Sequence, residues 1–267
     1  MMSTYLFNFF RLSLVLAAGL SISSLTSTAL AGATAPGSAF SDSATAGGAQ
    51  GGDARGQYLL AKKYRDGDGI LRNLNRAKHW FERSAQQGFA PAQIDLGQMY
   101  ARGLGMDVNY SKAVYWFGKA ADQGYAVAQF NLANMYRRGL GVKQDEAKAF
   151  QLYLQAAEQD FAEAQYNLGL MYSNGMGVEK DLQKASEWMS KSAKLGMARA
   201  QYQMGKLYQD GEGVQQDLVQ AVYWYRRASL SGHADGYRDA ELLKVKLTEQ
   251  QQVQLDKLVL GESMAAN

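Results

Sequence analysis

The sequence has few of the residues that carry chemistry, since it contains no cysteine and only two histidines. Without cysteine, the chain has no disulfide framework, no thiolate nucleophile, no thiolate metal site and no cysteine to lipidate. The two histidines, His79 and His233, lie far apart, and the motifs of serine hydrolases, zinc proteases and β-lactamases are missing. We therefore expect a non-catalytic protein with no catalytic residues, no cofactor and no metal site.

An excess of charge of one sign is also missing. The chain has 28 Lys and Arg against 25 Asp and Glu, which gives a formal net charge of +3. A protein that binds nucleic acid usually carries a clustered basic surface and a larger positive excess. The near balance of charges therefore predicts no nucleic-acid partner.

Residues 1–31 have the organisation of a secretory signal peptide. Arg11 is the only charged side chain, an apolar stretch runs from Leu12 to Leu20, and Ala29-Leu30-Ala31 forms an A-x-A cleavage site. The apolar stretch is shorter than the roughly 20 residues needed to span a bilayer. We predict cleavage after Ala31, no integral membrane segment in the mature chain, and a periplasmic or secreted location.

Residues 32–53 have almost no large apolar side chain and consist mainly of Gly, Ala, Ser and Thr. Such a segment buries too little apolar surface to offset the entropy lost on ordering. This composition is typical of a flexible linker, and we expect one here.

From residue 54 the sequence repeats with a period of 36 residues. Each copy has a Gly-x-Gly step in the same register, and the first glycines of the five steps are Gly67, Gly103, Gly139, Gly175 and Gly211. Repeats of this length without insertions are typical of stacked helical hairpins, in which each unit contacts its neighbours. The copies span residues 54–89, 90–125, 126–161, 162–197 and 198–233.

Each copy predicts two helices joined by the Gly-x-Gly turn. In the fourth copy, Ala164, Leu168 and Met171 form the apolar stripe of the first helix. We interpret both glycines of the step as the cap that ends this helix. An Asn or Asp able to cap the second helix occurs in every copy. These residues are Asn73, Asn109, Asp145, Asp181 and Asp217.

A recurrent tryptophan is expected to be the large buried residue of each second helix. It occurs at Trp80, Trp116, Trp188 and Trp224. The third copy departs from the pattern at three positions, with Leu152 for this tryptophan, Ala133 for a helix-packing glycine and Asp160 for a closing glycine. We expect the third copy to be the least regular joint of the array.

The pattern A-x-A-Q-x-x-L-G-x-M-Y-x-x-G-x-G-V-x-x-D-x-x-K-A-x-x-W-x-x-K-A-A-x-Q-G is similar to the Sel1-like repeat, a relative of the tetratricopeptide repeat. The resemblance covers residues 54–233. It implies an all-α fold, namely an α/α solenoid of five helical hairpins. Members of this family are commonly exported in bacteria and act as adaptors in assembly, signalling and envelope processes.

The pattern fades after His233, where we predict two capping helices over residues 234–260 and a tail at 261–267. The first is expected over residues 234–247. Thr248 and Gln251 then form a capping box that opens the last helix. Leu255, Leu258 and Val259 are expected to cover the final hairpin, as the end of a solenoid requires.

The candidate binding surface is the concave face, which the first helices line in stacked hairpins of this kind. Amides can hold a peptide backbone and arginine can clamp a carboxylate, so we predict a protein or peptide partner with an exposed carboxylate as a candidate group. Two alternatives stay open. The aromatic residues would otherwise pack between repeats, and Arg137 and Arg138 would form a solvated helix end. The candidate residues are Arg102, Phe130, Asn131, Asn134, Arg137, Arg138, Tyr166, Asn167, Tyr202 and Lys206.

Two further features suggest ligand sites only superficially. The Gly-x-Gly steps follow helices and lack the third glycine of a dinucleotide fingerprint. Asp66 and Asp68 lack the further carboxylates and the final Glu of a calcium loop. We interpret both features as turns.

The resemblance leaves three functions open. The first, which we favour, is a periplasmic adaptor that binds a protein or peptide through its concave face. The second is a cell-wall-related enzyme or wall-fragment binder, because cysteine-rich relatives are associated with weak β-lactamase activity and penicillin binding. The lack of cysteine counts against that function. The third is a structural subunit of an envelope machine, such as a flagellar motor or a secretion complex.

Overall fold

The computed structural model describes residues 52–265, and this part of the chain is entirely helical. The predicted signal peptide and residues 32–51 of the predicted linker lie outside the described residues. Five hairpins follow in chain order. Their first helices are α2 (Ala54–Asp66), α4 (Ala90–Arg102), α6 (Ala126–Arg138), α8 (Ala162–Asn174) and α10 (Ala198–Asp210). Their second helices are α3 (Leu74–Gln86), α5 (Tyr110–Ala121), α7 (Glu146–Ala157), α9 (Leu182–Lys194) and α11 (Leu218–Leu230).

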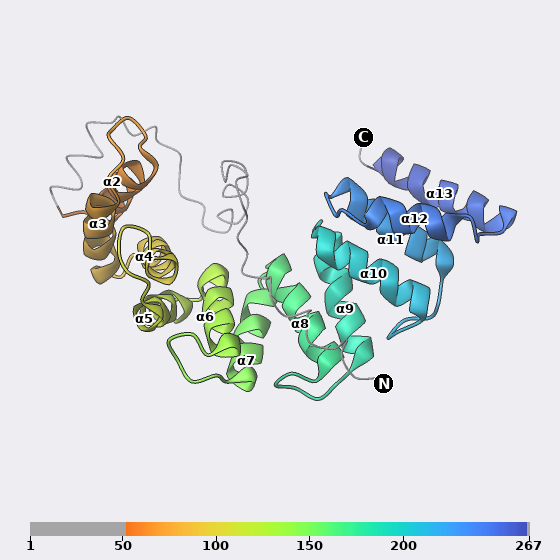
Figure 1. Cartoon of the computed structure of the whole chain (residues 1–267), viewed down its shortest axis with the longest axis horizontal. Coiled ribbons are helices and arrows are strands. Elements are labelled where there is room, and N and C mark those ends of the chain that lie inside the picture. Colours follow the sequence, from red (N-terminus) through yellow and green to blue (C-terminus); the bar gives the residue numbers. More distant parts are fainter. Residues whose placement is uncertain (1–51, 266–267) are drawn as a thin grey trace, which may run out of the picture. The chain divides into compact units, whose positions relative to one another are not determined.

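The hairpins stack as an α/α solenoid, as the repeat predicted. The two helices of each hairpin pack together, and each second helix packs on the first helix of the next hairpin. Figure 1 shows this succession from α2 to α11. Each hairpin therefore buries its apolar stripe against both its own partner helix and the following repeat.

The predicted helix caps are confirmed. Asn73, Asn109, Asp145, Asp181 and Asp217 are the N-caps of the second helices, and each side chain accepts a hydrogen bond from the backbone N–H three residues later. The first glycine of every step is a left-handed C-cap. Gly139, for example, has φ 65°. Asp53, at the end of the predicted linker, caps α2 by accepting a hydrogen bond from the Gly56 N–H at 2.7 Å.

The second glycine of each step has a role beyond the cap that we predicted. It lies against the first residue of the preceding hairpin's second helix, so closely that a side chain would not fit. A Cβ on Gly105 would lie 2.5 Å from the Cβ of Leu74. Gly69, which has no preceding hairpin, has open space at the same position. The corresponding neighbours of Gly105, Gly141, Gly177 and Gly213 are Leu74, Tyr110, Glu146 and Leu182.

The prediction that tryptophan is the main buried residue of the second helices was wrong for three of the four. Trp80, Trp116 and Trp188 are half-buried, and only Trp224 is buried. The residue that follows points into the hairpin instead and packs on a Gly or Ala of the first helix. A Cβ on Gly205, for example, would lie 2.5 Å from the Tyr225 ring. These inward residues are Phe81, Phe117, Tyr153, Met189 and Tyr225.

The third hairpin keeps the geometry of the others despite its three substitutions. Ala133 is fully buried in α6, where it takes the place of the packing glycine. Asp160 adopts φ 57°, the left-handed conformation that glycine has in the other hairpins. An Asp tolerates this conformation better than most residues. The third copy is therefore not an irregular joint, although Leu152 changes the surface of the array.

The C-terminal helices are α12 (Gly236–Lys244) and α13 (Glu249–Ala265), and both pack on α11. The capping box is present, since Thr248 N–H donates to Gln251 Oε1 at 3.0 Å and Gln251 N–H donates to Thr248 Oγ1 at 3.3 Å. Leu255 is buried and Leu258 is half-buried, but Val259 is exposed, contrary to expectation. The last helix also runs through most of the predicted tail.

A recurring glutamine pair links the two ends of each of the first three hairpins. The Nε2 of Gln87 donates to Oε1 of Gln57 at 2.8 Å, and the next two hairpins repeat this bond at the same distance. The fourth and fifth hairpins carry Leu195 and Ser231 where the donor would be. As a result, Oε1 of Gln165 and Oε1 of Gln201 are buried and accept no hydrogen bond among the described residues.

Leu195→Gln should therefore stabilise the protein by about 1 kcal/mol, because it supplies the missing donor to Gln165. Position 195 already has the backbone conformation of Gln87, with φ −76° and ψ 4° against −80° and 3°. Urea unfolding measures the effect. Leu195→Ser is the matched control, since it also removes the exposed leucine but supplies no amide. Equal stability of the two variants would contradict this account.

Candidate functional site

The candidate residues all lie on the first helices α4, α6, α8 and α10, as predicted. Their side chains are not equally available. Seven of the ten are half-buried, whereas Arg102, Arg138 and Lys206 are exposed. The contacts of each group show which side chains serve the fold and which are free for a partner.

The asparagine amides are engaged with their own helices. Nδ2 of Asn131 donates to the carbonyl of Val127 at 2.8 Å, and Nδ2 of Asn167 donates to the carbonyl of Glu163 at 2.7 Å. Bonds of this type satisfy one of the two amide N–H groups and hold the side chain along the helix. The other amide N–H remains for a ligand.

Asn134 and Arg137 are joined through the hydroxyl of Tyr153 from α7. This hydroxyl donates to Oδ1 of Asn134 at 2.8 Å and accepts from Nε of Arg137 at 3.3 Å. Tyr153 is fully buried, and burial raises the pKa of its hydroxyl. Its phenol needs partners in this position. Asn134 and Arg137 therefore also support the packing of α6 on α7.

Phe130 contacts neighbouring rings, and Tyr166 packs against the apolar core. Phe130 lies 5.8 Å from Tyr153 and 5.2 Å from Phe161, measured between ring centroids. Tyr166 is half-buried, and burial raises the pKa of its hydroxyl. These contacts favour the packing alternative for both residues.

Tyr202 belongs to a cluster at the C-terminal end of the array. Its hydroxyl donates to Oδ2 of Asp239 at 2.6 Å, and its pKa is raised to about 12 by burial and by this carboxylate. The His233 ring stacks on Tyr202 with centroids 4.1 Å apart and an interplanar angle of 8°. Burial lowers the pKa of His233 below its usual value. The cluster joins α10 to α12, which makes Tyr202 part of the C-terminal cap contact.

Arg102, Arg138 and Lys206 differ from the other candidates. Among the described residues, none of their side chains forms an ion pair or a hydrogen bond. Arg102 and Arg138 occupy the same position of successive repeats, in the last turns of α4 and α6. A cation there is favoured by the helix dipole, so this position suits both a solvated helix end and a partner's carboxylate.

Acidic side chains on the same face are already paired near its N-terminal end. Arg65 of α2 lies 2.9 Å from Oδ2 of Asp95 on α4 and 2.8 Å from Oδ1 of Asp66. Burial raises the pKa of the Asp95 carboxyl, and the Arg65 charge opposes that rise. The pair joins the first two hairpins.

The structure adds little in favour of catalysis or metal binding. The described part of the chain contains no cluster of three His, Cys, Asp or Glu side chains suited to a metal ion. His79 is exposed with its ring against Trp80, as expected of a surface residue. Asp66 pairs with Arg65, and the N–H of Asp68 donates to the Lys63 carbonyl in a turn. No helix within residues 52–265 is long and apolar enough to cross a membrane.

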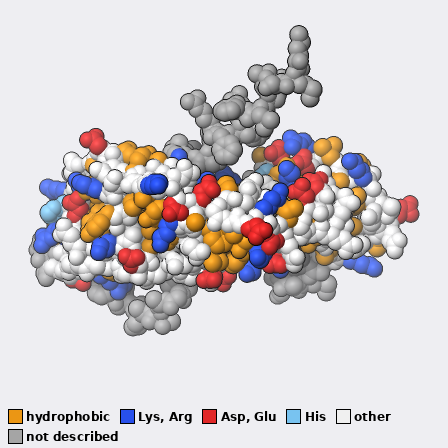
Figure 2. All heavy atoms as spheres, turned by 90° about the horizontal axis from the view of Figure 1, so that it is seen from below, with side chains coloured by type: hydrophobic (Ala, Val, Ile, Leu, Met, Phe, Trp, Pro, Cys, Tyr) orange, Lys and Arg blue, Asp and Glu red, His pale blue; other side chains and the backbone are white. Residues whose placement is uncertain are grey.

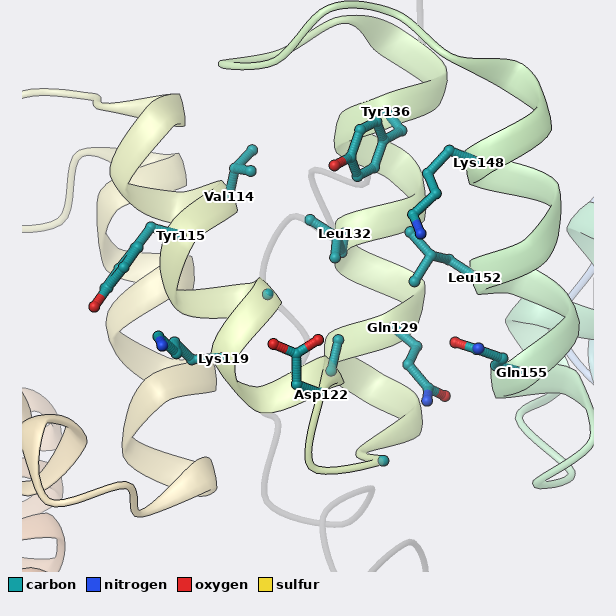
Figure 3. Close-up of a pocket in the computed structure, with 13 residues that line it drawn as sticks. Val114, Tyr115, Lys119, Asp122, Gln129, Leu132, Tyr136, Lys148, Leu152 and Gln155 are labelled. Carbon is teal, nitrogen blue, oxygen red and sulfur yellow. The ribbon is translucent and has the colours of Figure 1, made fainter.

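Sequence analysis missed a hollow between α5, α6 and α7 (Figure 3). It has a volume of about 650 Å³. Val114, Leu132 and Leu152 provide apolar lining, and Lys119, Asp122 and Lys148 are the charged residues. Leu152 in place of tryptophan was a visible signal. The cavity forms between two neighbouring hairpins, so the sequence pattern of a single helix could not predict it.

Comparison with known proteins agrees with the fold. The Sel1 repeat profile matches residues 54–89, 90–125, 126–161, 162–197 and 198–233. The chain belongs to the Sel1 repeat family, whose members are generally scaffolds for protein interactions. None of the curated proteins is similar enough to match the chain.

Two solved structures resemble this one closely. The first is c5321, a protective antigen of uropathogenic Escherichia coli with an SLR fold. It is 31% identical with a TM-score of 0.73, over 85% of this chain and 53% of the antigen. The second is a Sel1 repeat protein from Oxalobacter formigenes, 28% identical with a TM-score of 0.69, over 81% of this chain and 87% of that one. The chain thus spans about half of the antigen's length.

Tyr153→Phe should destabilise the protein by about 1 kcal/mol, because it leaves Asn134 Oδ1 and Arg137 Nε without their shared partner. Tyr237→Phe is the control, since Tyr237 is 67% exposed and forms no hydrogen bond among the described residues. Chemical unfolding of both variants checks the difference. Equal stability would mean that Asn134 and Arg137 do not depend on Tyr153.

Proposed function

We propose that the protein is an exported adaptor that binds an acidic protein segment, or a peptide with an exposed carboxylate, through the face formed by its first helices. The family assignment supports a scaffold that binds proteins. The finer proposal adds a location, a binding face and the charge of the partner. Export rests on the organisation of residues 1–31 as a signal peptide.

The observation that carries the proposal is the row of unpaired cations on the first helices. Arg102 and Arg138 stand at equivalent positions of neighbouring hairpins and are exposed, whereas α8 and α10 have Asn174 and Asp210 at this position. Lys206 is a further exposed cation at another position of α10. A guanidinium can bind a carboxylate through two parallel hydrogen bonds. A segment that crosses α4 and α6 would therefore meet one arginine per repeat.

Other side chains on the first helices are held in place by contacts within the fold, and they support this role by limiting the flexibility of the binding surface. Phe130 is held between rings of α7 and the following loop, and the Asn131 amide is held by its own helix. A surface that is ordered before binding loses less entropy when the partner arrives. Affinity would then depend mainly on the exposed cations, with the neighbouring groups providing shape.

Arg102→Glu with Arg138→Glu should weaken partner binding strongly while the protein stays folded, because neither side chain forms an ion pair or a hydrogen bond within the described residues. The matched control is Lys143→Glu with Lys180→Glu, an equal charge change in exposed loops between helices. Photo-crosslinking in the periplasm from position 134, followed by mass spectrometry, measures capture. The recovered chain should begin at Gly32.

One dominant partner that is captured by the parent and the control, but lost in the arginine variant, supports the proposal. Equal capture by all three proteins would contradict the assignment of the binding face. A chain that stays in the cytoplasm would contradict export and leave the binding face to be tested with the purified protein.

A further inference from the structure

A hollow between α5 of the second hairpin and α6 and α7 of the third is lined by none of the ten candidate residues. We call it the α5–α7 hollow, lined by Val114, Gly118, Leu132, Tyr136, Lys148 and Leu152, among others. Figure 3 shows Leu152 and Lys148 of α7 directed toward Leu132 and Tyr136 of α6. Figure 2 shows apolar and charged side chains interspersed on one face of the molecule. In the hollow itself, Leu132 and Leu152 are 7% and 6% exposed and form its floor.

Two residues smaller than their counterparts open this hollow. Leu152 stands where the other four hairpins have Trp80, Trp116, Trp188 and Trp224. Gly118 lies inside α5, where the other copies have Glu82, Leu154, Ser190 and Arg226. A Cβ on Gly118 would meet no atom within 4 Å. Close packing therefore does not require this glycine, although glycine inside a helix costs about 1 kcal/mol relative to alanine.

A lysine beside the hollow lacks the contact that its counterparts make. Arg76, Lys112 and Lys184 lie over the rings of Tyr64, Tyr100 and Tyr172, at 5.5, 5.1 and 5.6 Å from the centroids. Lys148 occupies the same position of the third repeat, but among the described residues it makes no such contact with Tyr136. Its side chain extends beside Leu152 instead (Figure 3).

The tryptophans of the other hairpins show which group suits a cation in this region. Nζ of Lys191 lies 3.9 Å from the centroid of the Trp188 ring, and the Arg83 guanidinium lies 5.4 Å from that of Trp80. Such contacts are attractive because the ring face is electronegative. In the third hairpin, Leu152 stands at the position of the ring and Gln155 at the position of these cations. Lys148, which lines the hollow without a ring contact among the described residues, is the cation of α7 that remains for an incoming ring.

We propose that the α5–α7 hollow binds a tryptophan or tyrosine side chain from a partner protein, which takes the place of the absent indole. The ring packs on Val114, Leu132 and Leu152 under the Lys148 ammonium. Its polar edge, an N–H or O–H, donates to an acceptor among Asp122, Gln129 and Gln155, which also line the hollow. Lys119, the second cation of the lining, already lies 5.7 Å from the centroid of the Tyr115 ring, so the cation–π contact of the incoming ring is assigned to Lys148 alone.

The test uses the whole protein and three neutral probes. N-acetyltryptophanamide has the ring and its N–H, N-acetyl-1-methyltryptophanamide lacks the N–H, and N-acetylleucinamide lacks the ring. Titrations are followed through the methyl NMR signals of Val114, Leu132 and Leu152. We expect saturable shifts with N-acetyltryptophanamide at a Kd of roughly 1 mM, weaker binding of the methylated probe, and none of the leucine probe.

Two variants make the outcome decisive. Leu152→Trp restores the residue of the other hairpins, so it should keep the fold and weaken probe binding by at least about tenfold, or 1.4 kcal/mol. Leu195→Trp is the matched control, because it adds a tryptophan at a leucine that is 51% exposed elsewhere, and it should bind like the parent. The absence of saturable shifts in the parent, or unchanged binding by Leu152→Trp, would overturn the proposal.

Discussion

The stacking of the hairpins depends on one close backbone contact that recurs at every junction. From the second described hairpin on, the second glycine of each Gly-x-Gly step lies against the start of the preceding hairpin's second helix, with no room for a side chain. At two junctions a serine adds a hydrogen bond to the same glycine, and Ser186 Oγ donates to the Gly213 carbonyl at 3.0 Å. The contact sets how near one repeat can approach the next, and the apolar stripes can then interlock.

Equal stacking places the same repeat position on the same surface in every hairpin. When the copies differ in the residue at one repeat position, the surface of the array therefore varies along the face on which that position lies. Arg102 and Arg138 show this on the first-helix face, where two neighbouring copies present an unpaired cation. Leu152 and Gly118 show it between α5 and α7, where two side chains smaller than their counterparts leave a hollow. A regular backbone with local substitutions is how a repeat scaffold gains specificity.

The sequence predicted the helices and their caps well, because the 36-residue period and the Asn or Asp caps depend on local chemistry. The sequence was less informative about which side chains contact one another in the folded protein. Trp80 and Phe81 are adjacent apolar residues, and only the packing of the hairpin decides which of the two side chains points inward. The bonds of Asn134 and Arg137 to Tyr153 likewise join residues from two helices. The exposed arginines remain candidates because the fold does not use them.

The most direct test of the stacking contact compares Gly213→Ala with Gly69→Ala. Both glycines have nearly the same φ, 68° and 70°, so the alanine in either variant should cause similar backbone strain. Only Gly213 faces a preceding helix, at Leu182. Unfolding in urea should show that Gly213→Ala loses about 1–3 kcal/mol more than Gly69→Ala, as expected for overpacking. Equal losses would contradict the claim that this contact sets the stacking of the repeats.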